Sequence, residues 1–364
     1  MVKRVVNFNA GPTGLPLAAL ERAQRELLDF EGTGMSIMEH SHRAKDYESV
    51  HNQAIALLSE LYGIPADYQV LLLQGGASMQ FALLPYNFLP PGKSADFVLT
   101  GTWARKAYAE AKIVGEARIA ANVEDEHGVC TRVPTQAELK RDPEAAYFHY
   151  CTNNTIMGTQ FHYVPDAGAV PLFADMSSDI GWKPFDISKY DLIYAGAQKN
   201  IGPAGVTVVI ARKSLLAGGR EDIPRIFRFK EHAKENSLMN TVPTFAVYMM
   251  RNVLEVVKEA GGLPAMEKRN REKAALLYGM LDEQPDFFRT SVEKQSRSVM
   301  NPVFRLPSEA LDARMVAEAT VAGFVGIKGH RIVGGIRVSM YNAVTPDQVA
   351  QFVEWAKAFA RANG

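Results

Sequence analysis

An aspartate and a lysine follow short apolar runs at two points in the middle of the chain. Asp175 comes directly after Val170–Ala174, and Lys199 lies among glycines between Tyr190–Ala195 and Gly205–Ala211. A carboxylate just past the end of a strand in an α/β sheet lies where ligands bind. A partly desolvated lysine has a lowered pKa, which suits it to act as a Schiff-base nucleophile. Two ordinary alternatives stay open, because Asp175 is also a good turn cap and most lysines are exposed.

A glycine turn provides the third part of a candidate site. The residues Gln74-Gly75-Gly76-Ala77-Ser78 stand between the apolar run Tyr68–Leu73 and a stretch with helical apolar spacing that starts at Met79. Glycines there let backbone N–H groups approach an anion, and the helix adds the positive end of its dipole. The pattern predicts a phosphate cradle or, as the plainer alternative, only a tight turn between a strand and a helix.

One cofactor requires a phosphate cradle, a carboxylate and a lysine together, and that is pyridoxal 5′-phosphate (PLP). Its phosphate needs N–H and hydroxyl donors, its pyridinium nitrogen needs an acidic partner, and its aldehyde needs a lysine amine. The flat ring also suits an aromatic neighbour, and Trp103 follows the turn Thr100-Gly101-Thr102 after another apolar run. The sequence therefore predicts PLP as the cofactor.

The composition argues against several other classes of protein. The 364 residues include 40 basic and 40 acidic side chains, so the formal net charge is +0. Proteins that bind nucleic acid or anionic membranes carry a basic excess. No apolar run has the length of a membrane span or a signal peptide, and the two cysteines, Cys130 and Cys151, favour a reducing compartment. We therefore expect a cytoplasmic protein with neither nucleic acid nor a membrane as partner.

Motifs for other chemistries are incomplete. Gly92-Lys93-Ser94 resembles the end of a Walker A motif, but Asn87 stands where its first glycine is required. The eight histidines are scattered, and the closest pair, His40 and His42, has no acidic or cysteine partners at a familiar ligand spacing. We therefore expect no metal site.

The elements that would position these residues alternate between strands and helices. This alternation is typical of a mostly parallel α/β sheet. The expected strands are Tyr68–Leu73, Ala95–Thr100, Ala146–Tyr150, Pro171–Ala174, Tyr190–Ala195 and Gly205–Ala211. The expected helices cover about 17–28, 50–61, a stretch from Met79, and 102–115.

After Thr241 the pattern changes to longer helices with few strands. Helices are expected over Phe245–Ala260, Met266–Leu281, Leu311–Ala322 and from a capping box at Thr345–Gln348, with strands at Asn301–Leu306 and Gly335–Met340. We predict a large PLP-binding domain over 16–261. A smaller α+β domain would contain 1–15 and 262–364.

Several short motifs along the chain match one known family. They are Asn7-Phe8-Asn9-Ala10-Gly11-Pro12, Met38-Glu39-His40-Ser41-His42-Arg43, Leu73–Ser78, Thr152–Gly158, Ala174–Asp179, Ala195–Asn200, Asn240–Phe245 and Gly329-His330-Arg331. On these motifs the chain resembles the phosphoserine aminotransferase family, in the class-V group of fold-type I PLP enzymes, over essentially its whole length. The resemblance implies a large domain with a mostly parallel seven-stranded sheet and a smaller C-terminal domain.

The resemblance implies a role for each residue around the cofactor ring. Lys199 would form the Schiff base and, once substrate displaces it, would move a proton between the substrate and the cofactor. Asp175 would pair with the pyridinium nitrogen. Trp103 would stack on the ring, and Thr155 would hydrogen-bond the phenolic oxygen.

The resemblance also assigns the phosphate to two chains. Gly76, Ala77 and Gln198 of one chain would hold it, and Asn240 and Thr241 would reach it from the partner subunit of a homodimer. One departure matters, because some relatives have arginine where this chain has Ala77. The phosphate pocket here would then carry one positive charge fewer.

Two short basic pairs are candidates for binding the substrate. Arginine suits carboxylates and phosphates, although an isolated pair such as His42-Arg43 or His330-Arg331 is more often surface charge. By resemblance, Arg331 would bind the α-carboxylate. His42, Arg43 and His330 would face the substrate phosphate or the distal carboxylate of glutamate.

The implied reaction exchanges an amino group between L-glutamate and 3-phosphohydroxypyruvate, giving 2-oxoglutarate and O-phospho-L-serine in serine biosynthesis. The family often also serves pyridoxine biosynthesis through 4-phosphohydroxy-L-threonine. One alternative is another class-V enzyme, such as a serine–pyruvate or alanine–glyoxylate transaminase. The other is a non-catalytic ligand sensor, which would not need the complete set of Asp175, Lys199 and Thr155.

Overall fold

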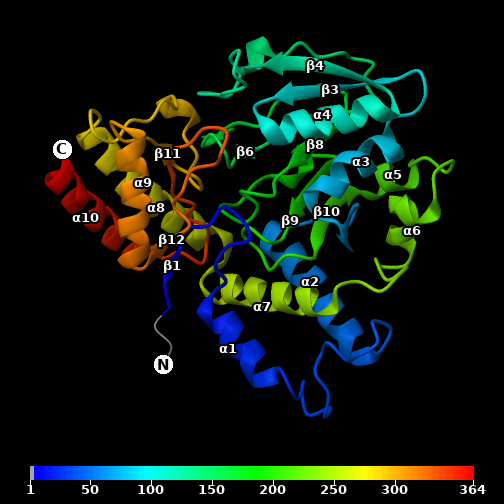
Figure 1. Ribbon diagram of the computed structural model, residues 1–364. Helices are drawn as coiled ribbons and strands as arrows, with labels where there is room; N and C mark the ends of the chain where they lie inside the picture. Colours follow the sequence, from blue (N-terminus) through cyan, green and yellow to red (C-terminus); the bar gives the residue numbers. More distant parts are fainter. Residues whose placement is uncertain (1–3) are drawn as a thin grey trace.

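A seven-stranded sheet forms the centre of the computed structural model, which describes residues 4–364 (Figure 1). Across the sheet the strands are β2 (Tyr68–Leu73), β10 (Thr207–Arg212), β9 (Leu192–Gly196), β8 (Leu172–Asp175), β5 (Phe148–Cys151), β3 (Ser94–Leu99) and β4 (Glu116–Asn122). Strand β10 runs antiparallel to β2 and β9, and the other neighbours are parallel. The prediction of a mostly parallel seven-stranded sheet is confirmed.

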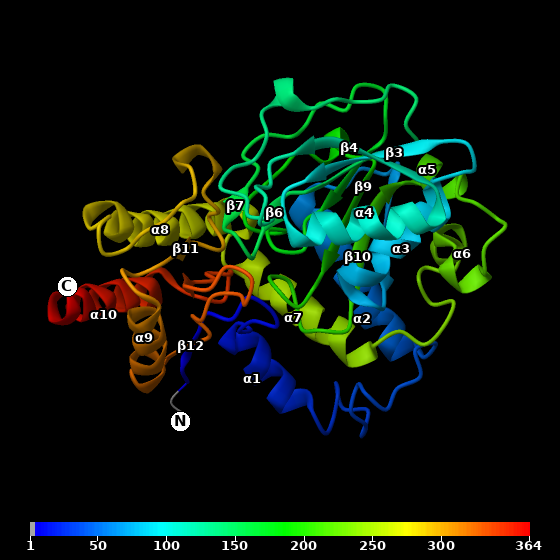
Figure 2. The ribbon, with the colours of Figure 1, turned by 45° about the horizontal axis from the view of Figure 1, so that its top comes forward.

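Successive residues of each strand enter two different cores, one on each face of the sheet. In β2, Val70 belongs to the buried cluster shared with α2 and α7, whereas Leu71 belongs to the one shared with α3 and α4. Figure 2 shows α4 lying across the strands. The helices of this part are α1 (Leu17–Glu26), α2 (Lys45–Tyr62), α3 (Gly76–Phe88), α4 (Thr102–Val114), α5 (Lys213–Ala217), α6 (Phe229–Lys234) and α7 (Thr244–Glu259). Within residues 4–364, none of the helices combines the length and the apolar character that crossing a membrane requires.

The C-terminal part has its own buried cluster, which includes Phe8 from the start of the chain together with Leu277, Met315 and Phe352. Its elements are β1 (Val6–Asn7), α8 (Gly262–Glu283), β11 (Val303–Phe304), α9 (Glu309–Val321), β12 (Phe324–Val325), β13 (Ile336–Arg337) and α10 (Pro346–Asn363). Strand β1 pairs with β12, so the first described residues lie against this part (Figure 1). That pairing supports the division into 16–261 and 1–15 with 262–364, which stays a prediction.

Several elements differ from the expectations, and three of the differences have a clear physical reason. Strand β4 was not expected, because Glu116–Asn122 is an edge strand in which six of seven residues are partly or fully exposed, so that no apolar run marks it. Helix α2 begins at Lys45, ahead of its apolar stretch, because its first turn is acidic and suits the helix dipole. Helix α8 already begins at Gly262, since Pro264 stands in its first turn, where no backbone N–H is needed.

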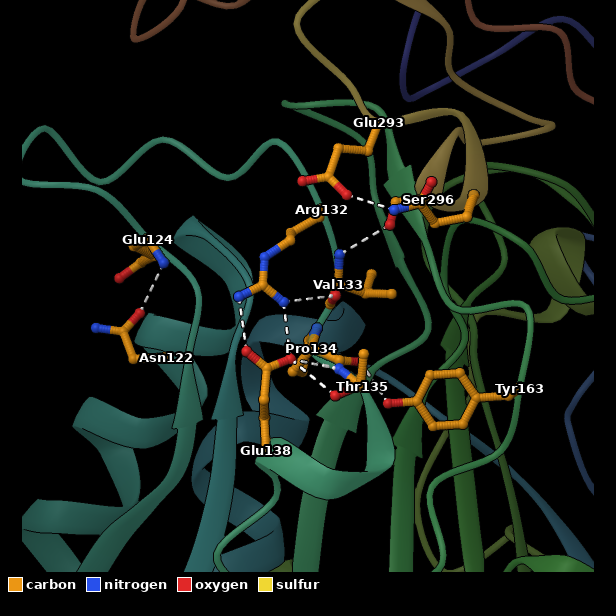
Figure 3. A network of polar contacts seen from close by, with 11 residues as sticks. Asn122, Glu124, Arg132, Val133, Pro134, Thr135, Glu138, Tyr163, Glu293 and Ser296 are labelled. Carbon is orange, nitrogen blue, oxygen red and sulfur yellow. Dashed lines mark hydrogen bonds and ion pairs between the residues drawn. The ribbon is translucent and has the colours of Figure 1, made fainter.

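A polar network ties the loop after β4 to the turn before β11 (Figure 3). The guanidinium of Arg132 donates to both carboxylate oxygens of Glu138, at 2.8 and 2.7 Å, and holds the pKa of Glu138 down to about 2. The backbone N–H of Thr135 donates to the same carboxylate at 2.8 Å. Next to this pair, the N–H of Val133 donates to the hydroxyl of Ser296 at 3.1 Å. The loop is thereby fixed to the C-terminal part.

Candidate active site

The strand register brings the expected site elements to one edge of the sheet. Leu73 of β2 pairs with Thr207 of β10, which in turn pairs with Gly196 of β9. Asp175 is the last residue of β8, the strand on the other side of β9. The glycine turn after β2, the loop after β9 and Asp175 therefore leave the sheet at the same edge.

Asp175 is a buried carboxylate that lies beside Lys199. Its residue is 7 % exposed, and one carboxylate oxygen accepts the backbone N–H of Ser177 at 2.9 Å. Burial raises the pKa of Asp175, while the hydrogen bonds from Ser177 and the charge of Lys199 lower it. Such a carboxylate favours a protonated partner, and a pyridinium nitrogen is one.

The N-terminal segment contacts both the backbone and the side chain of Lys199. The hydroxyl of Thr13 donates to the Lys199 carbonyl at 2.6 Å, and a Cβ atom on Gly11 would stand 3.2 Å from Lys199 Cγ. Burial lowers the pKa of the Lys199 amine, although the nearby Asp175 carboxylate raises it. A lowered pKa increases the neutral fraction of the amine, which is its nucleophilic form.

Trp103 and Thr155 form one unit beside Lys199. The indole N–H of Trp103 donates to the hydroxyl of Thr155 at 3.0 Å, and Lys199 Nζ lies 5.6 Å from the centre of the indole ring. Thr155 is 2 % exposed. The structure thus brings together the four residues that the sequence placed around the cofactor ring.

The expected phosphate cradle has the required backbone geometry. Gly75 and Gly76 have φ of +88° and +65°, and Gly76 opens α3. The N–H groups of the first helical turn have no partner within the helix and face an incoming anion. At the end of β9, a Cβ atom on Gly196 would stand 2.6 Å from Gln198 Oε1, so the Gln198 side chain lies over this strand end.

Arg337 was not among the site residues predicted from the sequence, yet the fold places its charge near Lys199. One guanidinium nitrogen of Arg337 donates to the Thr155 carbonyl at 3.0 Å, while its Nε is buried and finds no hydrogen-bond partner within residues 4–364. Burial lowers the pKa of Arg337, and its charge contributes to lowering the pKa of Lys199. A guanidinium with an unused donor beside the reactive amine suits a carboxylate. A signal for it was present in the sequence, because Arg337 is a charged residue inside the expected strand Gly335–Met340.

His330 and Arg331 lie at the tip of a short hairpin in the segment that links β12 to β13, where Lys328 pairs with Ile336. We call this segment the β12–β13 hairpin, although β12 itself pairs with β1 and β13 with β11. The His330 carbonyl accepts the N–H groups of Val333 and Gly334, which makes the turn tight. Burial lowers the pKa of His330, and the charges of Arg337 and Arg331 lower it further. Arg331 is exposed.

His42 and Arg43 are not brought to this hairpin in the single chain. They contact each other, with Arg43 Nε 3.1 Å from His42 Nε2. They stand in the segment between α1 and α2, which lies away from the β12–β13 hairpin in both ribbon views (Figures 1 and 2). The two basic pairs therefore lie apart within one chain.

Asn240 and Thr241 precede α7. The side chain of Gln74, directly before the glycine turn, donates to the Thr241 carbonyl at 3.0 Å. Thr241 is exposed, and Asn240 Oδ1 is buried with no hydrogen-bond partner in the described part of the chain. The pair thus borders the glycine turn of its own chain and leaves a side chain open to a neighbour.

The residues at this edge of the sheet fit PLP. They offer a buried carboxylate, an amine of lowered pKa, free N–H groups at a helix start and a buried guanidinium donor without a partner. Over residues 4–364, histidine, cysteine and acidic side chains form no cluster of three or more that could hold a metal ion. The arrangement can therefore support chemistry on an organic, anionic cofactor.

Comparison with known proteins places the chain among aminotransferases. The family model described as aminotransferase class-V matches residues 5–352. A phosphoserine aminotransferase of Halalkalibacterium halodurans is 49% identical over 358 residues, which are 98% of this chain and 99% of that protein. The phosphoserine aminotransferase structure from Bacillus circulans subsp. alkalophilus has 48% identity and a TM-score of 0.97, with 100% of each chain covered. A PLP-bound phosphoserine aminotransferase from Trichomonas vaginalis has 36% identity and a TM-score of 0.92, covering 97% of this chain and 100% of that one. With its site geometry and a match along nearly its full length, the chain belongs to the class-V aminotransferase family.

Proposed function

We propose that this chain is a PLP-dependent aminotransferase that exchanges the amino group between L-glutamate and 3-phosphohydroxypyruvate. The observation that carries the proposal is the amine of Lys199, whose pKa is lowered by burial and raised by the charge of Asp175, and whose Nζ lies 5.6 Å from the centre of the Trp103 ring. The names and full-length identity of the relatives support this choice of substrates. The absence of an arginine at Ala77 does not argue against it, because the α3 N-terminus supplies N–H donors of its own.

Three residues around the cofactor ring would have separate roles in the reaction. When bound, PLP supplies an aldehyde and an electron-withdrawing ring. Asp175 would keep a proton on the ring nitrogen, because a buried carboxylate is stabilised by an adjacent positive charge. Lys199 Nζ would hold the aldehyde carbon and then, once free, carry a proton to and from the substrate Cα. Trp103 would cover the ring and exclude water.

Binding of the two substrates requires one common contact and one variable contact. Both carry an α-carboxylate, for which we propose Arg337 in place of Arg331, since Arg337 is half-buried beside Lys199 and Arg331 is exposed. The phosphate or distal carboxylate would then meet the basic residues His42, Arg43, His330 and Arg331. Since the two basic pairs lie apart in one chain, we also propose a homodimer with shared sites, in which Asn240 and Thr241 reach the partner's phosphate.

We also propose that the protein works in the cytoplasm, where two buried free cysteines stay reduced. A role in pyridoxine biosynthesis stays a prediction. The test is an amino-transfer assay on purified protein with glutamate and a panel of phosphorylated and unphosphorylated keto acids. Preference for pyruvate or glyoxylate would identify another class-V enzyme, and a visible absorbance that glutamate does not change would indicate a non-catalytic ligand sensor.

A further inference from the structure

Lys273 is a buried lysine that the proposed reaction does not use. It lies in α8, its residue is 1 % exposed, and its ammonium donates hydrogen bonds to the carbonyls of Met340, Tyr341 and Val344, at 2.8, 2.9 and 3.0 Å. Over residues 4–364, no carboxylate forms an ion pair with it. Burial lowers the pKa of Lys273 to about 7. Burying an amine with no acidic partner costs free energy, and the hydrogen bonds to the three carbonyls offset part of that cost.

These carbonyls belong to the 340–344 turn, the segment that links β13 to α10. One side of the turn reaches the residue next to Lys199. The backbone N–H of Asn342 donates to Asn200 Oδ1 at 2.9 Å, and the Asn200 amide donates to the Ile180 carbonyl at 2.6 Å. Asn200 is 6 % exposed, so water cannot readily replace these bonds.

The other side of the turn reaches the N-terminal segment that packs on Lys199. The hydroxyl of Tyr341 donates to the Ala10 carbonyl at 3.1 Å and accepts the Asn301 amide at 3.2 Å. The next residue is Gly11, whose missing Cβ leaves room for the Lys199 side chain. The 340–344 turn therefore contacts the chain on both sides of the reactive lysine.

We propose that Lys273 is a positioning residue for Lys199, which it orients by fixing the 340–344 turn against Asn200 and Ala10. The proposal rests on the proposed function of Lys199. An apolar side chain at 273 would leave the carbonyls of Met340 and Val344 without this donor, and the turn would relax toward other partners. Small displacements of a reactive group cost up to about 100-fold in rate, so a modest shift at Asn200 is enough to reduce turnover.

The test compares the PLP-loaded wild type with Lys273→Met and with a matched control, Lys268→Met, which removes an exposed lysine from the same helix. We expect Lys273→Met to lower kcat at least tenfold with less than a threefold change in KM for glutamate. The pH at which the visible absorption band of the loaded protein changes should also move by half a unit or more. The control should match the wild type in both measurements. A Lys273→Met variant that keeps the wild-type kcat and the wild-type band would overturn the proposal.

A double-mutant cycle separates positioning from a general loss of stability. If Lys273 acts through Asn200, then Lys273→Met combined with Asn200→Ala should lower kcat no more than about twofold beyond the more damaging single change. If the double variant instead lowers kcat by the product of the two single effects, the two residues act independently and the proposal is overturned. Should Lys273→Met not fold, Lys273→Gln keeps two N–H donors and should give a smaller reduction and a smaller band shift. A Lys273→Gln variant with the kcat and the visible absorption band of the wild type would also overturn the proposal.

The two proposals fail in different ways. If wild-type protein does not use glutamate and 3-phosphohydroxypyruvate, the proposed function fails. The band measurement still decides the role of Lys273, because it needs PLP but no substrate.

Discussion

The indole N–H of Trp103 donates to the hydroxyl of Thr155 at 3.0 Å, although the two residues lie far apart in the sequence. Because that hydroxyl oxygen accepts from Trp103, the Thr155 proton is free to point to another acceptor, such as a phenolic oxygen. The Thr155 carbonyl meanwhile accepts from Arg337. Thr155 therefore links the residue expected to cover the cofactor ring to the residue proposed to bind the α-carboxylate.

The first prediction concerns Lys199. We expect Lys199→Ala to abolish amino transfer while the protein still folds and holds PLP non-covalently, because alanine offers neither an amine nor a proton carrier. Turnover, the visible spectrum and retention of PLP on dialysis measure the three effects. Lys189→Ala, which removes an exposed lysine ten residues earlier, is the control. Near-normal turnover in Lys199→Ala would remove this lysine from the reaction.

The second prediction separates Arg337 from Arg331. Losing a charge-assisted contact to a bound anion costs about 1.5–3 kcal/mol, which weakens binding tenfold or more. Arg337→Met should therefore weaken the binding of glutamate and of O-phospho-L-serine alike, since both carry an α-carboxylate. Arg331→Met should spare short substrates that lack a distal anion, such as alanine. Titration of the visible band with each amino acid gives the affinities, and an equal loss of alanine binding in both variants would contradict this assignment.

The third prediction concerns Arg43. Arg43→Ala should raise the KM for 3-phosphohydroxypyruvate about tenfold or more, by the same loss of a charge-assisted contact, and should leave PLP binding unchanged. The matched control is Arg361→Ala near the C-terminus, where the arginine is exposed. If Arg43→Ala keeps the parent kinetics, Arg43 is a surface residue and the phosphate pocket lies elsewhere.

Local patterns were enough to predict six of the seven strands of the sheet and the residues at their ends. Asp175 and Lys199 stand out because each interrupts an apolar run at the point where a parallel strand ends, and the register of β8 and β9 then brings them together. The expected strands at β2, β3, β5, β8, β9 and β10 all form, with ends shifted by one or two residues. Apolar period and turn residues carry this information locally.

Arg337 and Lys273 could not be predicted in the same way. Arg337 lies 138 residues from Lys199 in the sequence, and its proximity depends on how the β12–β13 hairpin packs against the Thr155 loop. Lys273 stands in a charge-rich helix, where a lysine ordinarily indicates a solvated face. Its burial follows from the way α8 meets the 340–344 turn, which is a tertiary contact that no local pattern encodes.

The fourth prediction concerns pH and Asp179. Burial raises the pKa of Asp179 from 3.8 to about 6, against the hydrogen bonds from Thr152 and Gln160. Between these values the folded protein binds a proton that the unfolded chain has lost, so the contribution of Asp179 to stability falls as pH rises from 4 to 6. A pKa shift of this size corresponds to a change of about 3 kcal/mol in the free energy of unfolding.

Chemical unfolding of the PLP-free protein across pH 4 to 7 checks this expectation. The free energy of unfolding of the wild type, relative to Asp179→Asn, should decline over that interval, because asparagine has no proton to lose. Asp166→Asn, at an exposed carboxylate, controls for the substitution itself. Parallel curves for wild type and Asp179→Asn would show that Asp179 does not retain its proton in the fold.

The last prediction tests whether each site combines two chains. If Asn240 and Thr241 reach the PLP phosphate of the partner, each site contains Lys199 of one chain and Thr241 of the other. Lys199→Ala chains are mixed with Asn240→Ala/Thr241→Ala chains, and the subunits are allowed to exchange. Each hybrid dimer then has one site with both lesions and one site with neither.

The intact site should restore activity toward half that of a wild-type dimer, in proportion to the fraction of hybrids that native mass measurement finds. Sites built from single chains would behave differently, because every site of the hybrid would then carry one lesion and nothing would be regained. The exposed Thr241 favours recovery, since its side chain is open to a neighbouring chain. Confirmed hybrids without recovery would assign both residues to the site of their own chain, where the Thr241 carbonyl already contacts Gln74.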